Sequence, residues 1–180
     1  IGGNDMTETI AGPGNDYIFA GDDLDTVLGD EGDDWMEGGR GPFALLQGDS
    51  GAPFQDDPNE FGHDVLFGWG GEQDYDAEGG DDIMFAGPGI QRAEGMRGFD
   101  WVTHRGDPVA GDADMAFTAL LAPAVDTNRD RFDMVEGLSG WFRGDVLRGD
   151  NGNSVSMVGH ELDEAGLNRI SGLAQVLEGA

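Results

Sequence analysis

One pattern recurs at a fixed spacing of nine residues through the middle of the chain. Glycines stand at positions 71, 80, 89 and 98. A second series with the same spacing comprises Asp64, Gln73, Asp82, Gln91 and Asp100, and a third, two residues further on, comprises Leu66, Tyr75, Met84, Ala93 and Val102. A glycine, a polar residue and an apolar residue that keep phase over five turns predict a solenoid of short parallel strands.

Each position of this nonad has a physical role. Glycines permit the backbone torsions of a tight turn and let carbonyl oxygens approach an ion, and Asp supplies the hard anionic oxygen that Ca²⁺ prefers. The apolar residue points inward from a short strand, whose side chains alternate between its two faces. Two nonads complete one coil, so Asp64, Asp82 and Asp100 share one edge of the roll, and Gln73 and Gln91 share the other. Because Gln offers only a neutral oxygen, we expect metal on the Asp edge alone.

Residues 1–46 carry a first array with the same nonad pattern. Asp16, Asp25 and Asp34 are nine apart, and each is followed two residues later by Ile18, Val27 or Met36. Thr7 and Phe43 take the Asp position of the flanking turns, and Gly41 and Leu45 keep the phase. By the eighteen-residue rule Asp16 and Asp34 share an edge, whereas Asp25 has only Thr7 and Phe43 as neighbours. We expect one good site and one doubtful site in this array.

Composition supports bound cations. The chain has 37 acidic and nine basic residues, a net charge of −28, and no cysteine. Such a charge density opposes compaction and excludes nucleic acid and membrane insertion as partners. A disordered acidic tail would lack the 16 aromatic residues, and general halophilic acidity would be scattered rather than fixed at one position of a nonad. Without disulfides, calcium can stabilise a secreted chain.

An acidic loop separates the two arrays, which occupy residues 1–46 and 64–103. Residues 47–63 break the nonad phase with Gly48, Gly51, Pro53 and Pro58. The loop also contains Asp49, Asp56, Asp57, Asn59 and Glu60. These side chains either form a calcium site outside the repeat or, more simply, a solvated acidic surface.

Residues 104–160 lose the nonad phase and are expected to form an irregular cap. Residues 115–125 are apolar enough for a strand or short helix packed on the roll. Asp126, Asn128 and Asp130 have the alternating spacing of calcium-loop ligands, but Arg131 and Gly137 stand where an EF-hand needs Gly and Glu. The segment is therefore either a local calcium site or an ordinary turn. Asp145 to Asp150 is a degenerate copy of the nonad.

A C-terminal helix is predicted over residues 161–178. Leu162, Ile170, Leu173 and Leu177 lie near one face, and the acids of its first turn suit the helix dipole. Outward positions of the roll carry Trp35, Trp101, Phe19, Phe67 and Phe85, of which Phe67 and Phe85 should stack. Such a stripe rarely stays bare. We expect residues 104–160, or else a partner chain, to cover it.

Two resemblances rest on these motifs. Residues 12–18, Gly12-Pro13-Gly14-Asn15-Asp16-Tyr17-Ile18, and residues 79–84, Gly79-Gly80-Asp81-Asp82-Ile83-Met84, resemble the RTX, or haemolysin-type, calcium-binding repeats of proteins exported by type I secretion. The stretches 45–51, 73–82, 98–101 and 131–141 look like the RTX-bearing region of large bacterial haem peroxidases of the animal-peroxidase type. Thr7, Phe43, Gln73 and Gln91 depart from the family's Asp, and Asp23 from a Gly, which puts metal binding at those turns in doubt.

The resemblance implies an all-β parallel roll, an RTX solenoid in two short arrays with an irregular cap and a terminal α-helix, that binds several Ca²⁺ ions. The candidate ligands are Asp16, Asp25, Asp34, Asp64, Asp82, Asp100, Asp126, Asn128, Asp130, Asp145 and the turn glycines Gly12, Gly14, Gly32, Gly80 and Gly98.

The expected function is that of a structural and secretion module of an extracellular bacterial protein, not an enzyme in itself, since His63, His104 and His160 have no catalytic motif around them. Its partners would be calcium and the rest of its parent chain. The alternative is a module that docks on, or contributes to, a peroxidase or a carbohydrate-active β-helix.

Overall fold

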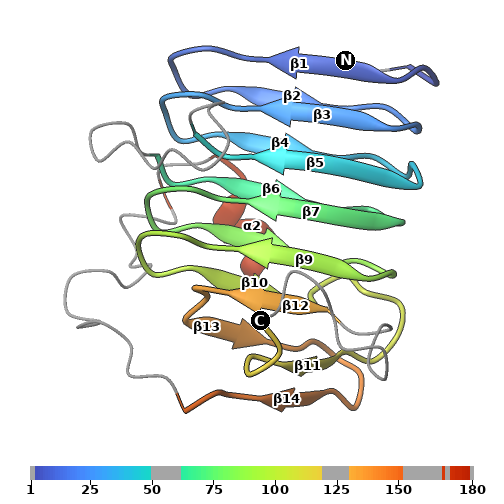
Figure 1. Cartoon of the computed structure of the whole chain (residues 1–180), viewed down its shortest axis with the longest axis vertical. Helices are drawn as coiled ribbons and strands as arrows, with labels where there is room; N and C mark the ends of the chain where they lie inside the picture. The colour runs from blue at the N-terminus through green and yellow to red at the C-terminus, as the bar shows by residue number, and fades with distance from the viewer. Residues whose placement is uncertain (1–2, 50–61, 119–129, 152–167, 169–170, 179–180) are drawn as a thin grey trace.

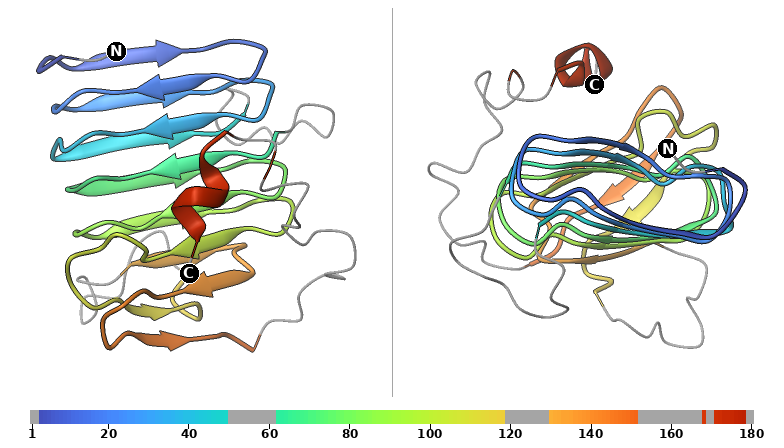
Figure 2. Two further views of the ribbon diagram at one scale, coloured as in Figure 1. Left: turned by 180° about the vertical axis from the view of Figure 1, so that it is seen from behind. Right: turned by 90° about the horizontal axis from the view of Figure 1, so that it is seen from above.

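The chain forms a flattened solenoid in which short parallel strands stack in two facing sheets (Figures 1 and 2). The computed structural model describes residues 3–49, 62–118, 130–151, 168 and 171–178. Sheet A contains, in order, β1 (Thr7–Ile10), β3 (Asp25–Leu28), β5 (Phe43–Gln47), β7 (Glu72–Asp76), β9 (Gln91–Glu94) and β12 (Arg131–Asp133). Sheet B contains β2 (Tyr17–Phe19), β4 (Trp35–Glu37), β6 (Val65–Phe67), β8 (Ile83–Phe85), β10 (Trp101–Thr103) and β13 (Gly137–Ser139). The prediction of an all-β parallel roll is confirmed.

The eighteen-residue coil predicted from the nonad sets the strand register. Ile18 pairs with Met36, Leu66 with Met84, and Met84 with Val102, all in parallel. Because the chain passes alternately through sheet B and sheet A, successive nonads face each other across the core. Every inward apolar residue therefore meets its equivalents from neighbouring coils.

The two repeat arrays stack on one another directly. Trp35 of β4 pairs with Val65 of β6, and Ala44 of β5 pairs with Gln73 of β7. The connection between β5 and β6 therefore does not interrupt the strand pairing of either sheet. The acidic residues at the two ends of this segment, Asp49 and Asp64, are both buried in the roll.

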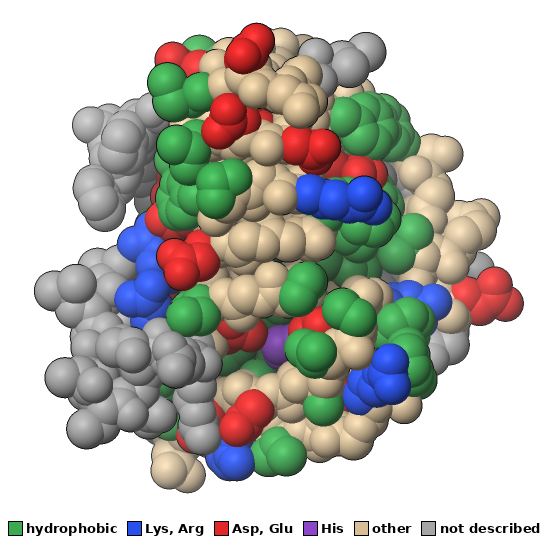
Figure 3. All heavy atoms as spheres, turned by 90° about the vertical axis from the view of Figure 1, so that its right-hand side faces the viewer, with side chains coloured by type: hydrophobic (Ala, Val, Ile, Leu, Met, Phe, Trp, Pro, Cys, Tyr) green, Lys and Arg blue, Asp and Glu red, His purple; other side chains and the backbone are tan. Residues whose placement is uncertain are grey.

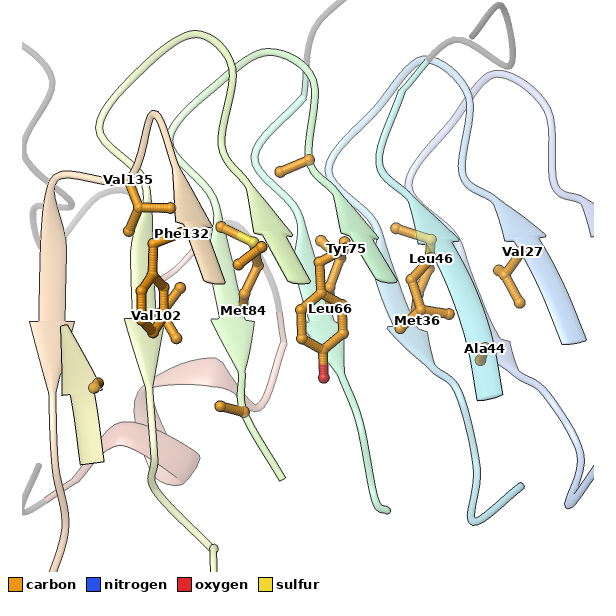
Figure 4. Close-up of a cluster of buried hydrophobic side chains, with 14 of the residues drawn as sticks. Val27, Met36, Ala44, Leu46, Leu66, Tyr75, Met84, Val102, Phe132 and Val135 are labelled. Carbon is orange, nitrogen blue, oxygen red and sulfur yellow. The ribbon is translucent and has the colours of Figure 1, made fainter. Parts of the chain in front are cut away.

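The core is a double column of inward side chains. Sheet B contributes Ile18, Met36, Leu66, Met84 and Val102, and sheet A contributes Val27, Leu46, Tyr75, Ala93 and Phe132 (Figure 4). Tyr75 is fully buried, and its hydroxyl donates to the carbonyl oxygen of Phe85 at 2.8 Å. A buried hydroxyl without a partner would be destabilising, so this bond allows a tyrosine at a core position.

The register of β5 corrects the sequence analysis by one residue. Asp25 pairs with Ala44 and Val27 with Leu46, so Phe43 does not occupy the Asp position and Leu45 does not point inward. Leu46 is fully buried, whereas Phe43 is exposed. The turn between β4 and β5 contains one residue more than the nonad allows. Spacing alone placed Phe43 and Leu45 wrongly because it cannot reveal where a turn absorbs an extra residue.

The C-terminal region continues the roll further than the repeat does. Phe132 of β12 pairs with Ala93, and Leu138 of β13 pairs with Val102, so each sheet gains a strand after the nonad phase is lost. β11 (Asp112–Asp114) and β14 (Val146–Arg148) form a further parallel pair. Of the predicted strand or helix at 115–125, Met115 packs against the core, and residues 119–125 lie outside the described residues.

A short helix covers the middle of the aromatic stripe, whereas Phe19 and Trp101 at its ends remain exposed. α2 (Leu173–Leu177) lies across the outer face of sheet B (Figure 2), where Leu173 and Val176 pack against a cluster comprising Trp35, Val65, Phe67, Ile83 and Phe85. Phe67 and Phe85 stack with ring centroids 4.5 Å apart, as predicted. Among the described residues the cover comes from α2 rather than from 104–160. The earlier part of the predicted helix, with Leu162 and Ile170, lies outside the described residues.

Candidate metal centre

Six acidic residues form a continuous column along one edge of the roll. This Asp column comprises Asp16, Asp34, Asp64, Asp82, Asp100 and Glu136. In each step, one carboxylate oxygen accepts a hydrogen bond from the backbone N–H of the column residue one coil earlier. The N–H of Asp64, for example, donates to Asp82 Oδ1 at 2.7 Å, and that of Asp82 donates to Asp100 Oδ1 at 3.0 Å. The predicted Asp edge is therefore confirmed as a geometric feature, and it runs through both arrays.

In the four middle members of the column, the second carboxylate oxygen has no hydrogen bond within the described part of the chain. Oδ2 of Asp34, Asp64, Asp82 and Asp100 is buried without a hydrogen bond among the described residues. The side chains themselves are at most 1% exposed. An unpaired buried carboxylate is strongly unfavourable, so each must either hold a proton or face a cation.

The pKa values of the column also indicate that each buried carboxylate needs a proton or a cation. Burial raises the pKa of Asp34 to about 7 and that of Asp100 to about 8. Burial, followed by the charges of neighbouring carboxylates, raises the pKa of Asp64 and of Asp82 well above the usual range. A divalent cation would favour the ionised forms and reverse these shifts.

Backbone carbonyl oxygens converge on the unpaired carboxylates. A Cβ atom built on Gly48 would meet both Asp64 Oδ2 and the carbonyl oxygen of Ala77, one coil further on. The same pair of oxygens recurs beside Gly29, from Asp34 and Gly48, and beside Gly95, from Asp100 and Met134. Clustered hard oxygens, anionic and neutral, are the ligand set of Ca²⁺, which takes six to eight of them. The residues of the Asp column therefore fit calcium.

Turn glycines bring the coils close enough for this arrangement. Gly80 and Gly98 have φ values of 132° and 138°, and a Cβ on either would meet the carbonyl oxygen of the equivalent glycine one coil earlier. Gly32 lies against Gly14 in the same way. Gly12 and Gly14 also have positive φ, but nothing lies within 4 Å of their Cβ positions. At these two positions only the backbone torsion calls for glycine.

The opposite edge contains neutral residues in its middle. This Gln column comprises Thr7, Asp25, Ala44, Gln73, Gln91 and Asp130. Gln91 Oε1 accepts from the N–H of Gln73 at 3.0 Å, as an Asp oxygen does on the other edge. The amide nitrogens of Gln73 and Gln91 donate to the turn carbonyl oxygens of Gly70 and Gly87. The side-chain N–H group of each Gln thus satisfies a turn carbonyl oxygen, which on the other edge could bind a cation instead.

Figure 3 looks onto the edge of the Gln column, whose middle is mainly backbone and neutral side chains.

Asp25, also in the Gln column, has both carboxylate oxygens satisfied. Oδ1 accepts from the N–H and the hydroxyl of Thr7, and Oδ2 accepts from the N–H of Gly21 at 2.9 Å. Asp25 therefore lacks the free oxygen that marks the Asp column. The doubt that the sequence placed on this site has a structural basis.

Asp130 and Asp145, two further predicted ligands, lie apart from the Asp column. Asp130 ends the Gln column, where its Oδ1 accepts from the N–H of Gln91 at 2.8 Å. Asp145 repeats the nonad hydrogen bond beside β14: its oxygens accept from the N–H groups of Gly111 and Trp141, both at 2.8 Å. Burial raises the pKa of Asp145, but these hydrogen bonds outweigh burial and the pKa lies below its usual value. Asp126 and Asn128 lie outside the described residues.

Three acidic residues escaped the repeat pattern. Glu136 ends the Asp column, but it comes only six residues after Asp130, so a search at nine could not find it. The sequence feature that indicates Glu136 as a repeat position is Leu138, an apolar residue two positions later that pairs with Val102. Glu78 is buried beside Gln47, whose amide donates to Glu78 Oε1 at 2.8 Å. Asp49 is buried as well, although its sequence neighbours mark it as a loop residue.

The two described histidines, His63 and His104, have different surroundings. His63 takes a turn position, with its N–H donating to Asp33 Oδ1 at 3.0 Å and its Nδ1 accepting from the N–H of Asp81 at 2.8 Å. His104 is buried, and burial lowers its pKa. Its ring nitrogens lie 3.9 Å from Asp107 Oδ2 and Asp130 Oδ2, beyond hydrogen-bond distance. His160 lies outside the described residues.

No group of three or more His, Cys, Asp or Glu side chains converges on one point in the part of the chain that the structure describes. An ion at the Asp column would therefore need backbone carbonyls together with one or two carboxylates, as the surroundings of Gly48 provide. Within the same residues, no helix is both long and apolar enough to cross a bilayer.

The parallel roll, the glycine-rich turns and the column of buried aspartates together have the arrangement expected of a calcium-binding β-roll. Residues 10–42 match the family model of the RTX calcium-binding nonapeptide repeat, in four copies, which indicates a Ca²⁺-binding module of the RTX type in this stretch. The repeat is a structural rather than a catalytic unit. No curated protein and no solved structure matches the chain. The match concerns the repeats alone and gives no support to the peroxidase resemblance.

Proposed function

We propose that the chain is a module that folds on binding several Ca²⁺ ions and stabilises a secreted bacterial protein. The observation that carries the proposal is the Asp column, in which four buried carboxylates each keep one oxygen without a protein partner. The ions would lie between successive coils, held by Asp34, Asp64, Asp82 and Asp100 and by carbonyl oxygens of the adjacent turns. Asp16 and Glu136 would close the two ends.

The energetics favour coupling between ion binding and folding. A site filled at ten times its dissociation constant stabilises the folded state by about 1.4 kcal/mol. Four such sites would contribute about 6 kcal/mol, comparable with the whole stability of a small domain. Without ions, the raised pKa values of the column mean that burying the carboxylates costs free energy at neutral pH.

The cellular role follows from the repeat family and the composition. RTX repeats are typical of secreted bacterial proteins. Calcium is scarce inside cells and abundant outside, so a chain with net charge −28 would stay extended during export and fold on arrival. A catalytic domain, if the parent protein has one, lies outside this chain. Exposed Trp69, Trp141 and Phe142 favour a second role, docking on such a neighbouring domain.

Chelation tests the proposal. The chain in millimolar Ca²⁺ should give a β-sheet circular dichroism spectrum and a cooperative thermal transition. Excess EGTA at pH 7.5 should abolish both, and added Ca²⁺ should restore them. A spectrum and a transition midpoint that do not respond to EGTA would overturn the proposal. Mg²⁺ at the same concentration serves as the control for ionic strength.

A further inference from the structure

The second turn position of the nonad forms its own column beside the Asp column. Asp30, Asp49, Glu78 and Met96 are equivalent in successive coils, since the N–H of Asp30 donates to the carbonyl of Asp49 and strand pairing continues the register. Asp30, Glu78 and Met96 have φ values of 75°, 73° and 69°. The repeat places Gly here, so each of these side chains is a departure that the turn tolerates.

Asp49 differs from the other members of this column. It is 1% exposed, Oδ2 accepts from the N–H of Gly79 at 3.1 Å, and Oδ1 is buried without a hydrogen bond among the described residues. Asp30 is only half-buried, and its oxygens are not among the unpartnered buried atoms. Met96 has no oxygen in its side chain. Glu78 is also buried, and its Oε1 accepts from the amide of Gln47 at 2.8 Å. Asp49 is the fully buried member that directly follows a glycine lying against an unpaired oxygen of the Asp column.

The unpaired oxygen of Asp64 lies beside the same turn. Gly48, which directly precedes Asp49, is closely approached by Asp64 Oδ2 and by the carbonyl oxygen of Ala77. Among the charges that raise the pKa of Asp64, that of Asp49 comes first, after the effect of burial. Burial, together with the charge of Glu78, likewise raises the pKa of Asp49 to about 7. Two buried carboxylates and a carbonyl oxygen therefore face one small region.

We propose that Asp49 adds a second carboxylate to the ion site of Asp64, so that this coil binds Ca²⁺ more tightly than the coils of Asp34 and Asp100. The inference rests on the proposed function, because it presumes that the Asp column binds calcium. Affinity for Ca²⁺ rises with the number of charged ligands, and at the second turn position the coils of Asp34 and Asp100 have the half-buried Asp30 and the uncharged Met96. Asp49 and Asp64 lie on either side of the connection between β5 and β6 in the sequence, so calcium bound by both would link the two ends of that connection.

Calorimetric titration of Ca²⁺ into the full 180-residue chain tests the inference with a matched pair of variants. Asp49→Asn and Asp30→Asn each remove one charge from equivalent positions of adjacent coils. The Asn side chain keeps an acceptor for the N–H of Gly79. We expect Asp49→Asn to weaken the tightest dissociation constant at least tenfold and Asp30→Asn to change it less than threefold. Equal changes in the two variants would overturn the inference and leave the proposed function intact.

The stability of the calcium-free chain provides a second readout. Removing a buried, unpaired carboxylate should leave the EGTA-treated Asp49→Asn chain no less ordered than the parent, whereas its folding midpoint in a Ca²⁺ titration should rise. A midpoint equal to that of the parent, or failure to fold at any calcium concentration, would contradict a role confined to one ion site. A parent chain that binds no Ca²⁺ would overturn both this inference and the proposed function.

Discussion

At the scale of single residues, the difference between Asp and Gln decides which edge can bind metal. Asp82 presents one oxygen to the backbone of Asp64 and leaves the other unpaired. Gln91 presents its oxygen to Gln73 but turns its amide N–H toward the carbonyl of Gly87. One side chain therefore needs a cation, and the other provides its own hydrogen-bond donor.

Asp82→Ala should lose calcium as well as stability, because Asp82 lies one coil from both Asp64 and Asp100 and can serve an ion on either side. Loss of two ions bound at ten times their dissociation constants would cost about 3 kcal/mol. Gln91→Ala should keep the full calcium stoichiometry and lower stability by the usual 0.5 to about 3 kcal/mol of a single change. Calorimetry and the thermal midpoint report both. Equal loss of bound calcium in the two variants would contradict the edge assignment.

Gln91→Asp should make the turn at Gln91, which now forms its hydrogen bonds within the protein, dependent on calcium. The new carboxylate can still accept from the N–H of Gln73, but it loses the amide donor to Gly87 and gains a buried charge. We expect a lower thermal midpoint in EGTA and a larger rise on adding Ca²⁺ than in the parent chain. Gln91→Asn is the uncharged control. A variant whose calcium response equals that of the parent would show that this edge cannot accept an ion.

At the scale of secondary structure, α2 protects the outer face of sheet B. Leu173 is 1% exposed and packs with Phe85, Ile83 and Val65. The helix is too short to be stable by itself, so it holds its place through this contact and through bonds such as that from Tyr17 to the carbonyl of Ser171.

Leu173→Asp should release α2 from the roll, because a charge would be buried among aromatic side chains. The exposed stripe should then bind a hydrophobic dye, and the chain should associate at high concentration in calcium. The number of bound ions should not change, since Leu173 lies far from the Asp column in sequence and on the outer face of the sheet. Gln175→Asp, on the exposed side of the same helix, is the control. Unchanged dye binding by Leu173→Asp would contradict the covering role.

At the scale of the whole molecule, protons and calcium compete for the same buried carboxylates. The pKa of Asp34 is raised to about 7 and that of Asp100 to about 8 in the ion-free fold. A raised folded-state pKa means that the folded chain binds more protons than the unfolded chain. Its contribution to stability is complete below the ordinary Asp pKa and disappears as the pH rises through the raised value.

The response to pH should therefore reverse with calcium. In EGTA, the chain should gain structure as the pH falls from about 8 toward 4, because protons neutralise the Asp column. In saturating Ca²⁺, acidification over the same range should lower the thermal midpoint, because protons displace the ions. Circular dichroism in both buffers tests this reversal. Parallel pH profiles with and without calcium would mean that the column does not exchange protons for ions.

The sequence by itself determined the repeat, and with it the coil length, the strand register of most nonads and the separation of the Asp and Gln edges. A period of eighteen residues fixes which side chains lie above one another, as for Asp64, Asp82 and Asp100. It also foretold the stacking of Phe67 on Phe85. These features follow from local geometry, which a strict repeat encodes in every turn.

Only the tertiary structure decided what lies outside the period. The extra residue before β5 moved Ala44 and Leu46 into the places expected for Phe43 and Leu45. A connection of irregular length brings Asp130 to the end of the Gln column and Glu136 to the end of the Asp column. Asp49 became a buried acid beside Asp64, although its sequence neighbours mark it as part of a loop. The physical reason is that sheet pairing and core packing, not sequence spacing, choose the register wherever a turn departs from nine residues.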